Sequence, residues 1–489
     1  MSVLDPLIRL SASISTRQQK ASGLRDPGLW GATVDGAGHL ALDAVDVPSL
    51  VTRFGSPLLA VSRSKLKLDA GSFRTAVEAA LPGSMIAYSY KTNCVPGVLG
   101  ELHSAGFGAE VISPYELWLA ERLGVPGDRI VVNGVNKDYE FLHEAVRVGA
   151  ASINVDHPGE LEHLRKAAAR LQQKARLSLR LKVDRSSHFG LGIETGEAES
   201  VARAILEVPE LFEFAGLHFH AVADNDDPAP HIGYMMTALE FAKRIKSTLG
   251  LATANLNIGG GYTVPTMKVM SRFEYARQRF LGVPACPPDP HGGTAFSDYI
   301  SRVAQALDAF CTANALPRPR IILEPGRIVT SQSHVMLTLV HAVKPNTAGP
   351  DFAMTDAGKI LTSYPCDYEY HQIFAANRMQ EESLQSYHLM GRLCTSADWL
   401  ARFRCLPKLQ SGDVLAVMDA GAYFTSYSSN FAFPRPEVVM VDEGEAYTLR
   451  RRETYEHLVA MDDVAPLSEE ETALLPAVEA PLAGDWGTG

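Results

Sequence analysis

The sequence has few features of a secreted, metal-bound, nucleic-acid-binding or membrane-spanning protein. Among 489 residues there are only six cysteines, without a CxxC pair or zinc-like spacing, which favours free thiols in a reducing compartment and no metal site. No apolar run is long enough to cross a bilayer, and the first sixteen residues lack the apolar core of a signal peptide. The net charge of −11 argues against nucleic acid as the main partner. These absences predict a cytoplasmic protein with neither a membrane nor nucleic acid as its partner.

An alternating pattern of strands and helices dominates residues 56–328, which we take as one domain. Apolar runs typical of strands are separated by amphipathic, helix-like stretches. Eight such alternations over about 240 residues predict a (β/α)8 barrel, with a doubly wound open sheet as the alternative. The expected strands are 85–90, 107–112, 129–133, 151–155, 176–183, 212–219, 254–258 and 320–324.

The two ends of the chain differ from this central pattern. Residues 329–465 carry short β-type runs separated by turn residues, which predicts an all-β second domain. Residues 1–55 are expected to contribute to it, and the acidic tail at 466–489 is expected to be poorly ordered. The stretch 262–294 is too long for a simple loop, so it is either an insertion over one mouth of the barrel or a surface excursion.

A lysine stands where the first expected strand ends. Residues 85–90 are apolar or aromatic apart from Ser89, and Lys91 follows directly. An amine desolvated at this position loses proton affinity and can attack carbonyl compounds, whereas a solvated loop lysine is the alternative. Polar residues follow the other strands too, and in a parallel barrel all of them gather at the C-terminal mouth, where active sites lie. They are Glu110, Ser113, Asn133, Asp156, 187–190, 218–220, 259–262 and 324–327.

Three of these groups have a specific chemical interpretation. The glycines at 259–261 expose backbone N–H groups that suit a phosphate, unless they form only a flexible turn. Glu324 could hold a protonated ring nitrogen or form a salt bridge with Arg327. His220 could stack on an aromatic cofactor or be a hydrogen-bonded core histidine. Together with Lys91, these groups match the phosphate, pyridine nitrogen, ring and aldehyde of pyridoxal phosphate.

Lys91, His220, the glycines at 259–261 and Glu324 follow one another in this order. In these motifs the chain resembles the fold-type III pyridoxal phosphate enzymes, specifically the diaminopimelate and ornithine decarboxylase group. The resemblance spans about residues 55 to 460. It implies an alanine racemase-like barrel that binds pyridoxal 5'-phosphate, with a second β-barrel domain built from both chain ends. The matching motifs are Tyr88-Ser89-Tyr90-Lys91-Thr92-Asn93, Gly216-Leu217-His218-Phe219-His220, Ile258-Gly259-Gly260-Gly261, Glu324-Pro325-Gly326-Arg327, Asp356-Ala357-Gly358, Cys394-Thr395-Ser396, Asp419-Ala420-Gly421-Ala422-Tyr423 and Ser428-Ser429-Asn430.

The resemblance also implies roles for individual residues. Lys91 is expected to form the internal aldimine, Glu324 to pair with the pyridine nitrogen and His220 to stack on the ring. Arg327 is expected to contact the phosphate or the substrate carboxylate. Cys394 is expected to reach the partner subunit's site as a proton donor, which implies an obligate homodimer with shared active sites. The implied reaction is decarboxylation of an amino acid through an external aldimine and a quinonoid carbanion. The residues expected around the phosphate are Gly260, Gly261, Gly326 and Tyr423.

The chain departs from the family pattern at three places. A Gly-Ser pair usually follows the stacking histidine, whereas this chain has residues 221–225, Ala-Val-Ala-Asp-Asn. An Arg-Pro is replaced by Tyr364-Pro365, and the glutamate after the cysteine by Thr395. Because both replacements are neutral, the distal charges of meso-diaminopimelate would lack partners, and we predict a different amino acid or amino-acid conjugate. The arginines at 272, 277 and 279 could supply a replacement cation. The expected substrate contacts are Arg327, Tyr364, Tyr368 and Thr395.

Four alternatives remain at this level. The chain could be a true diaminopimelate decarboxylase or an amino-acid racemase on the same fold, although the Cys394 motif favours decarboxylation. It could be a non-catalytic pyridoxal phosphate-binding protein, but such relatives are usually short and lack the β-domain. It could also be a cofactor-free barrel that binds a ligand.

Overall fold

The computed structural model describes residues 22–362 and 365–463, together with 6, 10, 13–14 and 17–19. It divides into two compact units, Met1–Arg452 and Glu453–Gly489. In the second unit the described secondary structure is α15 (Tyr455–Val459). Tyr364 and the predicted tail at 466–489 lie outside the described residues.

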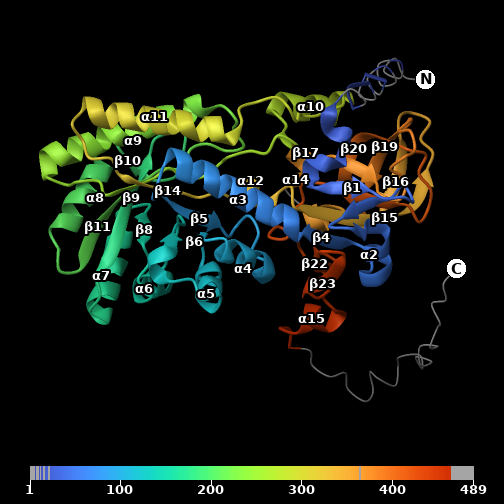
Figure 1. Cartoon of the computed structure of the whole chain (residues 1–489). Helices are drawn as coiled ribbons and strands as arrows, with labels where there is room; N and C mark the ends of the chain where they lie inside the picture. The colour runs from blue at the N-terminus through green and yellow to red at the C-terminus, as the bar shows by residue number, and fades with distance from the viewer. Residues whose placement is uncertain are drawn as a thin grey trace. The chain divides into compact units, whose positions relative to one another are not determined.

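Eight parallel strands form a closed barrel at the centre of the first unit (Figure 1). Each strand pairs with the next along the chain, and β14 pairs with β5 to close the ring. Most strand residues are buried, as expected where helices cover the outside of a parallel sheet. The predicted barrel is therefore confirmed, and the open-sheet alternative is excluded. Its strands are β5 (Met85–Ser89), β6 (Gly108–Val111), β7 (Ile130–Val132), β8 (Ser152–Val155), β9 (Ala175–Lys182), β11 (Phe212–His218), β12 (Asn255–Asn257) and β14 (Arg320–Leu323), with a short β10 (Leu191–Gly192) beside β9.

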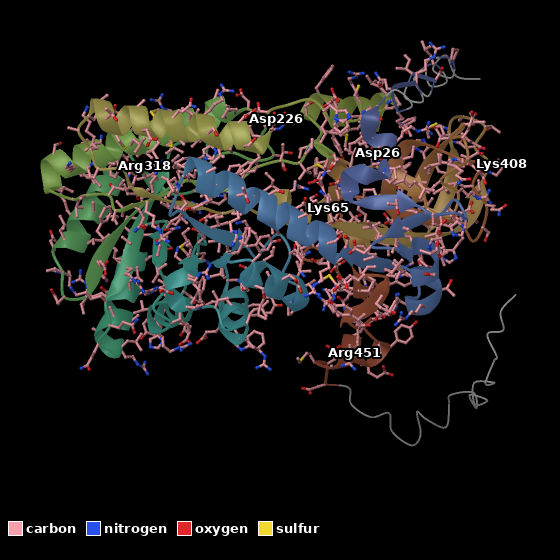
Figure 2. All side chains as sticks on the ribbon, viewed as in Figure 1. Asp26, Lys65, Asp226, Arg318, Lys408 and Arg451 are labelled. Carbon is pink, nitrogen blue, oxygen red and sulfur yellow. The ribbon has the colours of Figure 1, made fainter. Side chains whose placement is uncertain are left out.

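Helices connect these strands, and side-chain caps mark where several of them begin. The Ser62 side chain accepts from the N–H of Lys65 at the start of α3, and Ser113 does the same for α5. One turn into α3, Lys65 (labelled in Figure 2) forms an ion pair of 2.7 Å with Asp69. The helices are α3 (Arg63–Ala80), α4 (Pro96–Ser104), α5 (Pro114–Arg122), α6 (Tyr139–Arg147), α7 (Glu160–Leu171), α8 (Glu197–Leu206), α9 (Pro228–Leu249) and α11 (Phe296–Ala313), with a 3-10 turn η3 (Gly127–Arg129) before β7.

A β-rich domain follows the barrel, as predicted. Its paired strands run in the order β20-β19-β16-β15-β4-β22-β23, with β21 and β18 branching from β15. Strand β4 (Leu58–Ser62) pairs with β15 and β22, although the predicted boundary at residue 56 assigns it to the barrel. The other elements are α12 (Arg327–Thr330), β15 (His334–Lys344), β16 (Asp351–Thr355), α13 (Lys359–Thr362), α14 (Pro365–Tyr368), β17 (Glu369–Tyr370), β18 (Ile373–Ala375), β19 (Gln385–Met390), β20 (Trp399–Leu406), β21 (Val414–Val417), β22 (Glu437–Asp442) and β23 (Glu445–Arg450).

The N-terminal segment packs on this second domain through apolar side chains. Leu24, Trp30 and Leu40 share one buried cluster with Val335 and Leu337 of β15. Full burial of one aliphatic side chain of this kind stabilises the folded state by roughly 1.5–3 kcal/mol. The segment's elements are η1 (Gly23–Arg25), η2 (Pro27–Trp30), β1 (Ala32–Val34), β2 (Leu40–Leu42), β3 (Val45–Asp46) and α2 (Val47–Phe54).

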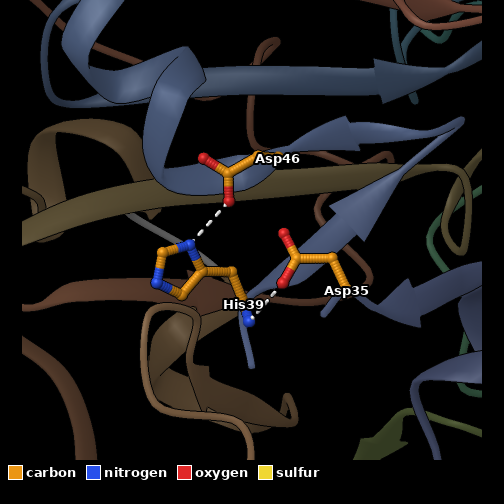
Figure 3. A group of neighbouring side chains, drawn as sticks. All are labelled: Asp35, His39 and Asp46. Carbon is orange, nitrogen blue, oxygen red and sulfur yellow. Dashed lines mark hydrogen bonds and ion pairs between the residues drawn. The ribbon is translucent and has the colours of Figure 1, made fainter. Parts of the chain in front are cut away.

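Three polar side chains meet at the turn of this small sheet. Asp35 accepts from the backbone N–H of His39, and His39 Nδ1 lies 2.9 Å from Asp46 (Figure 3). Within the described residues, this is the group of His, Cys, Asp and Glu side chains whose atoms lie close enough to share an ion. Turn hydrogen bonds account for its closeness, and we assign it no metal.

The insertion after the glycine-rich loop contacts the second domain. Its strand β13 (Lys268–Val269) pairs antiparallel with β17, and its helix α10 (Arg272–Leu281) lies beside β17 and β20 (Figure 1). Serine 271 and Glu274 form a capping box that starts this helix. The insertion is therefore anchored to the β-rich domain through backbone pairing.

Buried histidines should make the fold sensitive to mild acid. Burial lowers the pKa of His231 and of His334 to about 4, from 6.5. Because the pKa in the folded chain is the lower one, the unfolded chain binds more protons below pH 6.5, so this stability is complete above pH 6.5 and falls as the pH falls. We expect the free energy of unfolding to drop by on the order of a few kcal/mol from pH 6.5 to 4.5, measured by urea denaturation.

A His231→Gln variant should show a shallower pH slope, because its glutamine does not titrate. The exposed His157→Gln variant is the control and should follow the parent curve. A stability that stays constant across this pH range would contradict the prediction.

Candidate active site

Lys91 lies at the mouth of the barrel, two residues after β5. Its Nζ donates to Glu110 Oε2 at 2.9 Å, and the Lys91 side chain is one-third exposed while that of Glu110 is fully buried. Glu110 Oε2 also accepts from Ser89, and its Oε1 accepts from Asn133 at 2.7 Å. The lysine is therefore positioned by a carboxylate that is itself held by two other side chains.

The charge state of Lys91 corrects the expectation from the sequence. Burial alone would lower the pKa of Lys91, as the strand-end position predicts. The Glu110 carboxylate at 2.9 Å, aided by Glu324, outweighs burial, and the pKa of Lys91 is raised. Without cofactor, the lysine is therefore an ammonium group paired with Glu110, and the sequence pattern of Lys91 alone did not reveal this partner.

Glu324, directly after β14, is a buried carboxylate with one oxygen held and one open. Its Oε1 accepts from Asn257 Nδ2 at 2.7 Å and from Asn133 Nδ2 at 2.9 Å. Its Oε2 is buried without a hydrogen-bond donor. Burial would raise the pKa of Glu324, but His218 and Lys91 lower it below its usual range. An ionised oxygen without a donor is costly when buried, so this atom suits a protonated ring nitrogen.

His220 lies beside this carboxylate with a neutral ring. The backbone N–H of Gly260 donates to His220 Nδ1 at 3.2 Å, and His220 Nδ1 lies 3.9 Å from Glu324 Oε2. Burial and the positive charge of Lys91 lower the pKa of His220 to about 3. A neutral imidazole presents a flat face on which an aromatic ring can stack.

The glycines at 259–261 form a turn that side chains could not enter. A Cβ at Gly260 would overlap the carbonyl oxygen of Glu324, and Gly261 has a φ of +91°. Glycine is required where the backbone approaches this closely or adopts a left-handed conformation. The open turn beside His220 therefore has the shape and exposed backbone that a phosphate group needs.

Arg327 is held by two acids of this chain, and Glu324 is not one of them. Its Nε lies 2.7 Å from Asp224 and its Nη2 lies 2.6 Å from Glu369. Its guanidinium carbon lies 5.3 Å from the ring centre of Tyr423. The salt bridge with Glu324 considered from sequence does not form. Asp224 comes from the segment that replaces the usual Gly-Ser, so this departure places a carboxylate on Arg327.

The remaining residues of the predicted site fall into two groups. Tyr423 lies in the site, where its N–H donates to the Thr92 carbonyl at 2.8 Å. Gly326 precedes Arg327 at the start of α12. Cys394 and Thr395 are exposed in the loop between β19 and β20. The ring of Tyr368 lies tilted against that of Tyr275 in the insertion, with ring centres 5.2 Å apart. Tyr364 lies outside the described residues.

Two residues of the site, one acid and one amide, were not identified from the sequence. Glu369 is buried in β17 and holds Arg327, and Asn257 at the end of β12 orients Glu324. Asn257 lies near the end of a predicted strand, which is a signal that could have identified it, whereas the polar neighbours of Glu369 give no such signal.

These side chains fit pyridoxal phosphate. The Lys91 amine matches its aldehyde, and the open Glu324 oxygen matches a protonated pyridine nitrogen. The neutral His220 ring matches the cofactor ring, and the glycine turn matches the phosphate. The fold and site therefore define a pyridoxal phosphate-binding barrel of the alanine racemase-like type.

Known proteins agree with this class. The family described as "Pyridoxal-dependent decarboxylase, pyridoxal binding domain" matches residues 72–331. The chain is 30% identical to the diaminopimelate decarboxylase of Pseudomonas fluorescens, over 88% of this chain and 98% of that protein. It is 29% identical to that of Methanocaldococcus jannaschii, over 88% and 96% respectively. A crystal structure of the latter enzyme superposes with a TM-score of 0.77 at 27% identity, covering 89% of this chain and 98% of that one.

The chain therefore belongs to the pyridoxal-dependent decarboxylases, in the diaminopimelate and ornithine group. It is a pyridoxal phosphate-dependent amino-acid decarboxylase. Among its described residues, no helix has the length and apolar character needed to cross a membrane. Five cysteines with described side chains are free thiols, as predicted: Cys94, Cys286, Cys311, Cys394 and Cys405.

Glu110→Gln should make Lys91 reactive at lower pH, because it removes the charge that stabilises the ammonium form. We expect the midpoint for binding pyridoxal phosphate to Lys91, followed by visible absorption across a pH series, to fall by about one unit or more. Ser89→Ala is the matched control, since it removes a hydrogen bond to Glu110 but keeps the charge. An unchanged midpoint in the glutamine variant would show that Glu110 does not set the charge state.

Proposed function

We propose that the protein decarboxylates an amino acid or amino-acid conjugate other than meso-diaminopimelate. The main support for decarboxylation is the buried Glu324 carboxylate. Its Oε2 has no hydrogen-bond donor and lies beside His220 and Lys91, where it can pair with the ring nitrogen of the cofactor. In the reaction the bond from Cα to the carboxylate carbon breaks, CO2 leaves and a proton adds to Cα. Pyridoxal phosphate, when bound, takes up the electron pair that the departing CO2 leaves behind.

Each side chain of the candidate active site has a defined task in this proposal. Lys91 Nζ would hold the cofactor through the aldehyde of pyridoxal phosphate. Glu324 Oε2 holds a proton at the ring nitrogen, while Asn133 and Asn257 fix the carboxylate through its other oxygen. The neutral His220 covers one ring face and excludes water. These groups are preorganised before substrate arrives, which lowers the cost of charge development.

The final proton comes from Lys91 Nζ or from Cys394 Sγ. Glu110 accepts from Lys91 Nζ at 2.9 Å and, against the effect of burial, raises the pKa of Lys91, so this amine is suited to hold a proton. Cys394 is exposed on a loop of the second domain. We propose that this loop enters the site of a partner subunit in a cytoplasmic homodimer, where Thr395 and Tyr364 contact the substrate.

The identity of the distal substrate group rests on two neutral residues. The resemblance implies an arginine before the proline and a glutamate after the cysteine, and this chain has Tyr364 and Thr395 there. Without the glutamate, the second ammonium of that substrate would be desolvated without an ion pair, at a cost of roughly several kcal/mol. The natural substrate therefore has a different distal group.

Hybrid dimers test the shared site. Lys91→Ala and Cys394→Ala should each lower kcat for CO2 release, the first by at least about 1,000-fold, because each removes a group that bonds to cofactor or substrate. After subunit exchange, half of the dimers are hybrids with one intact site of two, so an equal mixture should recover about a quarter of the parent activity. Exchange without any recovery would exclude a site built from two chains.

A substrate panel tests the choice of substrate. Purified enzyme with pyridoxal phosphate is assayed for CO2 release from meso-diaminopimelate, lysine, ornithine and larger amino-acid conjugates. We expect kcat/KM for meso-diaminopimelate to be at least about tenfold below the best substrate. If meso-diaminopimelate has the highest kcat/KM, the chain is an ordinary diaminopimelate decarboxylase.

A further inference from the structure

A cavity of about 260 Å³ lies between the insertion and the β-rich domain. Helix α10 forms one wall, strand β20 another, and α13, α14 and β17 complete it. Its lining is rich in charge, which is unusual for a space of this size. The charged residues are Arg279, Lys359, Asp367, Glu369, Arg402 and Arg404.

Both acids in this lining already have cationic partners. Lys359 forms an ion pair with Asp367. Glu369 accepts from Arg327 Nη2 at 2.6 Å and lies 2.9 Å from His371 Nε2. The two carboxylates of the lining are therefore neutralised by cationic side chains other than Arg279 and Arg402.

Two arginines lack such a partner in the described part of the chain. Neither Arg279 nor Arg402 forms an ion pair there with a carboxylate. The guanidinium of Arg402 lies 3.6 Å from the ring centre of Trp399, which fixes its orientation. Burial and the nearby charge of Arg279 lower the pKa of Arg402 to about 10. Asp367 offsets part of this effect on Arg402, but its carboxylate is already paired with Lys359. Two neighbouring guanidinium groups without a carboxylate of their own create a positive potential that an anion would relieve.

We propose that this cavity binds a carboxylate or phosphate group between Arg279 and Arg402. Guanidinium groups suit this role because their parallel N–H donors match the oxygens of such anions. The cavity adjoins the catalytic centre, since Glu369 lines it and also holds Arg327. The assignment of this group rests on the proposed function. We take the distal acid of the amino-acid substrate as the main source of the bound group. A free small anion has the same chemistry and is the second source.

The first experiment compares acids with matched amides. The holoenzyme is assayed with α-amino dicarboxylates of increasing length and with their ω-amides, which have the same size but no distal charge. We expect kcat/KM for the best acid to exceed that of its amide by at least about tenfold. Arg402→Gln and Arg279→Gln should each remove most of this preference by raising KM for the acid, with little change in kcat.

Arg272→Gln is the matched control. It removes a positive charge from the same helix, but Arg272 does not line the cavity, so the preference for the acid should remain. An effect of equal size in all three variants would show that only the general charge of the insertion matters, and would overturn the assignment.

The second experiment uses glutarate as the probe and isothermal titration calorimetry of the holoenzyme, in which the cofactor's phosphate already occupies its own site. Binding that Arg402→Gln abolishes supports the anion cavity. If glutarate then competes with an ω-amide substrate, the cavity receives the distal substrate group; if it binds without competing, the cavity holds a free anion. No preference for acids together with no glutarate binding would overturn the proposal.

This design separates the two proposals. If no amino acid releases CO2, the proposed function fails, yet the glutarate titration still tests the cavity. If amino acids are decarboxylated but neither experiment shows an anion effect, only the cavity assignment fails.

Discussion

The buried carboxylate of Glu324 is the constraint on which the rest of the site depends. One oxygen is fixed by amide groups from β12 and from the residue after β7, and the other has no donor. Leaving an ionised oxygen unsatisfied costs roughly 1–3 kcal/mol or more, which is tolerated where a ligand supplies the missing donor. The closed barrel is what makes this arrangement possible, because it brings the ends of distant strands together. Glu324 and Asn133 are 191 residues apart in sequence, yet they share a hydrogen bond.

Asn133 also links Glu324 to Glu110 and thereby to Lys91. A single amide nitrogen donates to both carboxylates. These two acids raise the pKa of Lys91 and, together with other charges, set the electrostatics of the mouth. The reactive amine and the ring-nitrogen partner are therefore not independent, since a shift of Asn133 would change both.

Much of this could be predicted from the sequence because parallel barrels obey local rules. The barrel strands are three to eight residues long and mostly buried, and the polar residue that follows such a strand lies at the mouth. Lys91, His220 and Glu324 were identified in this way, together with the glycine turn. The raised pKa of Lys91 was not predicted, because it depends on the short distance to Glu110, which no local sequence pattern encodes. The role of Glu369 was missed for the same reason: its partner Arg327 lies 42 residues earlier in the chain, and no local pattern joins the two. Strand β4 was assigned to the barrel from its position in the chain. Its backbone hydrogen bonds to β15 and β22 place it in the sheet of the β-rich domain instead.

The insertion places positive charge beside a strand that also contacts the catalytic centre. Its backbone pairing with β17 sets α10 against β20, so Arg279 reaches the same cavity as Arg402. In β17, Glu369 itself pairs with Val269 of β13, and its side chain holds Arg327. The same short strand thus connects the insertion to the catalytic centre on its other side. Asp224 adds a second acid to Arg327 from the segment where the family usually has a serine. Because a doubly paired arginine has less positive charge to offer a substrate carboxylate, cations elsewhere must supply any anion recognition that the substrate requires. The arginines gathered by the insertion are in a position to do so.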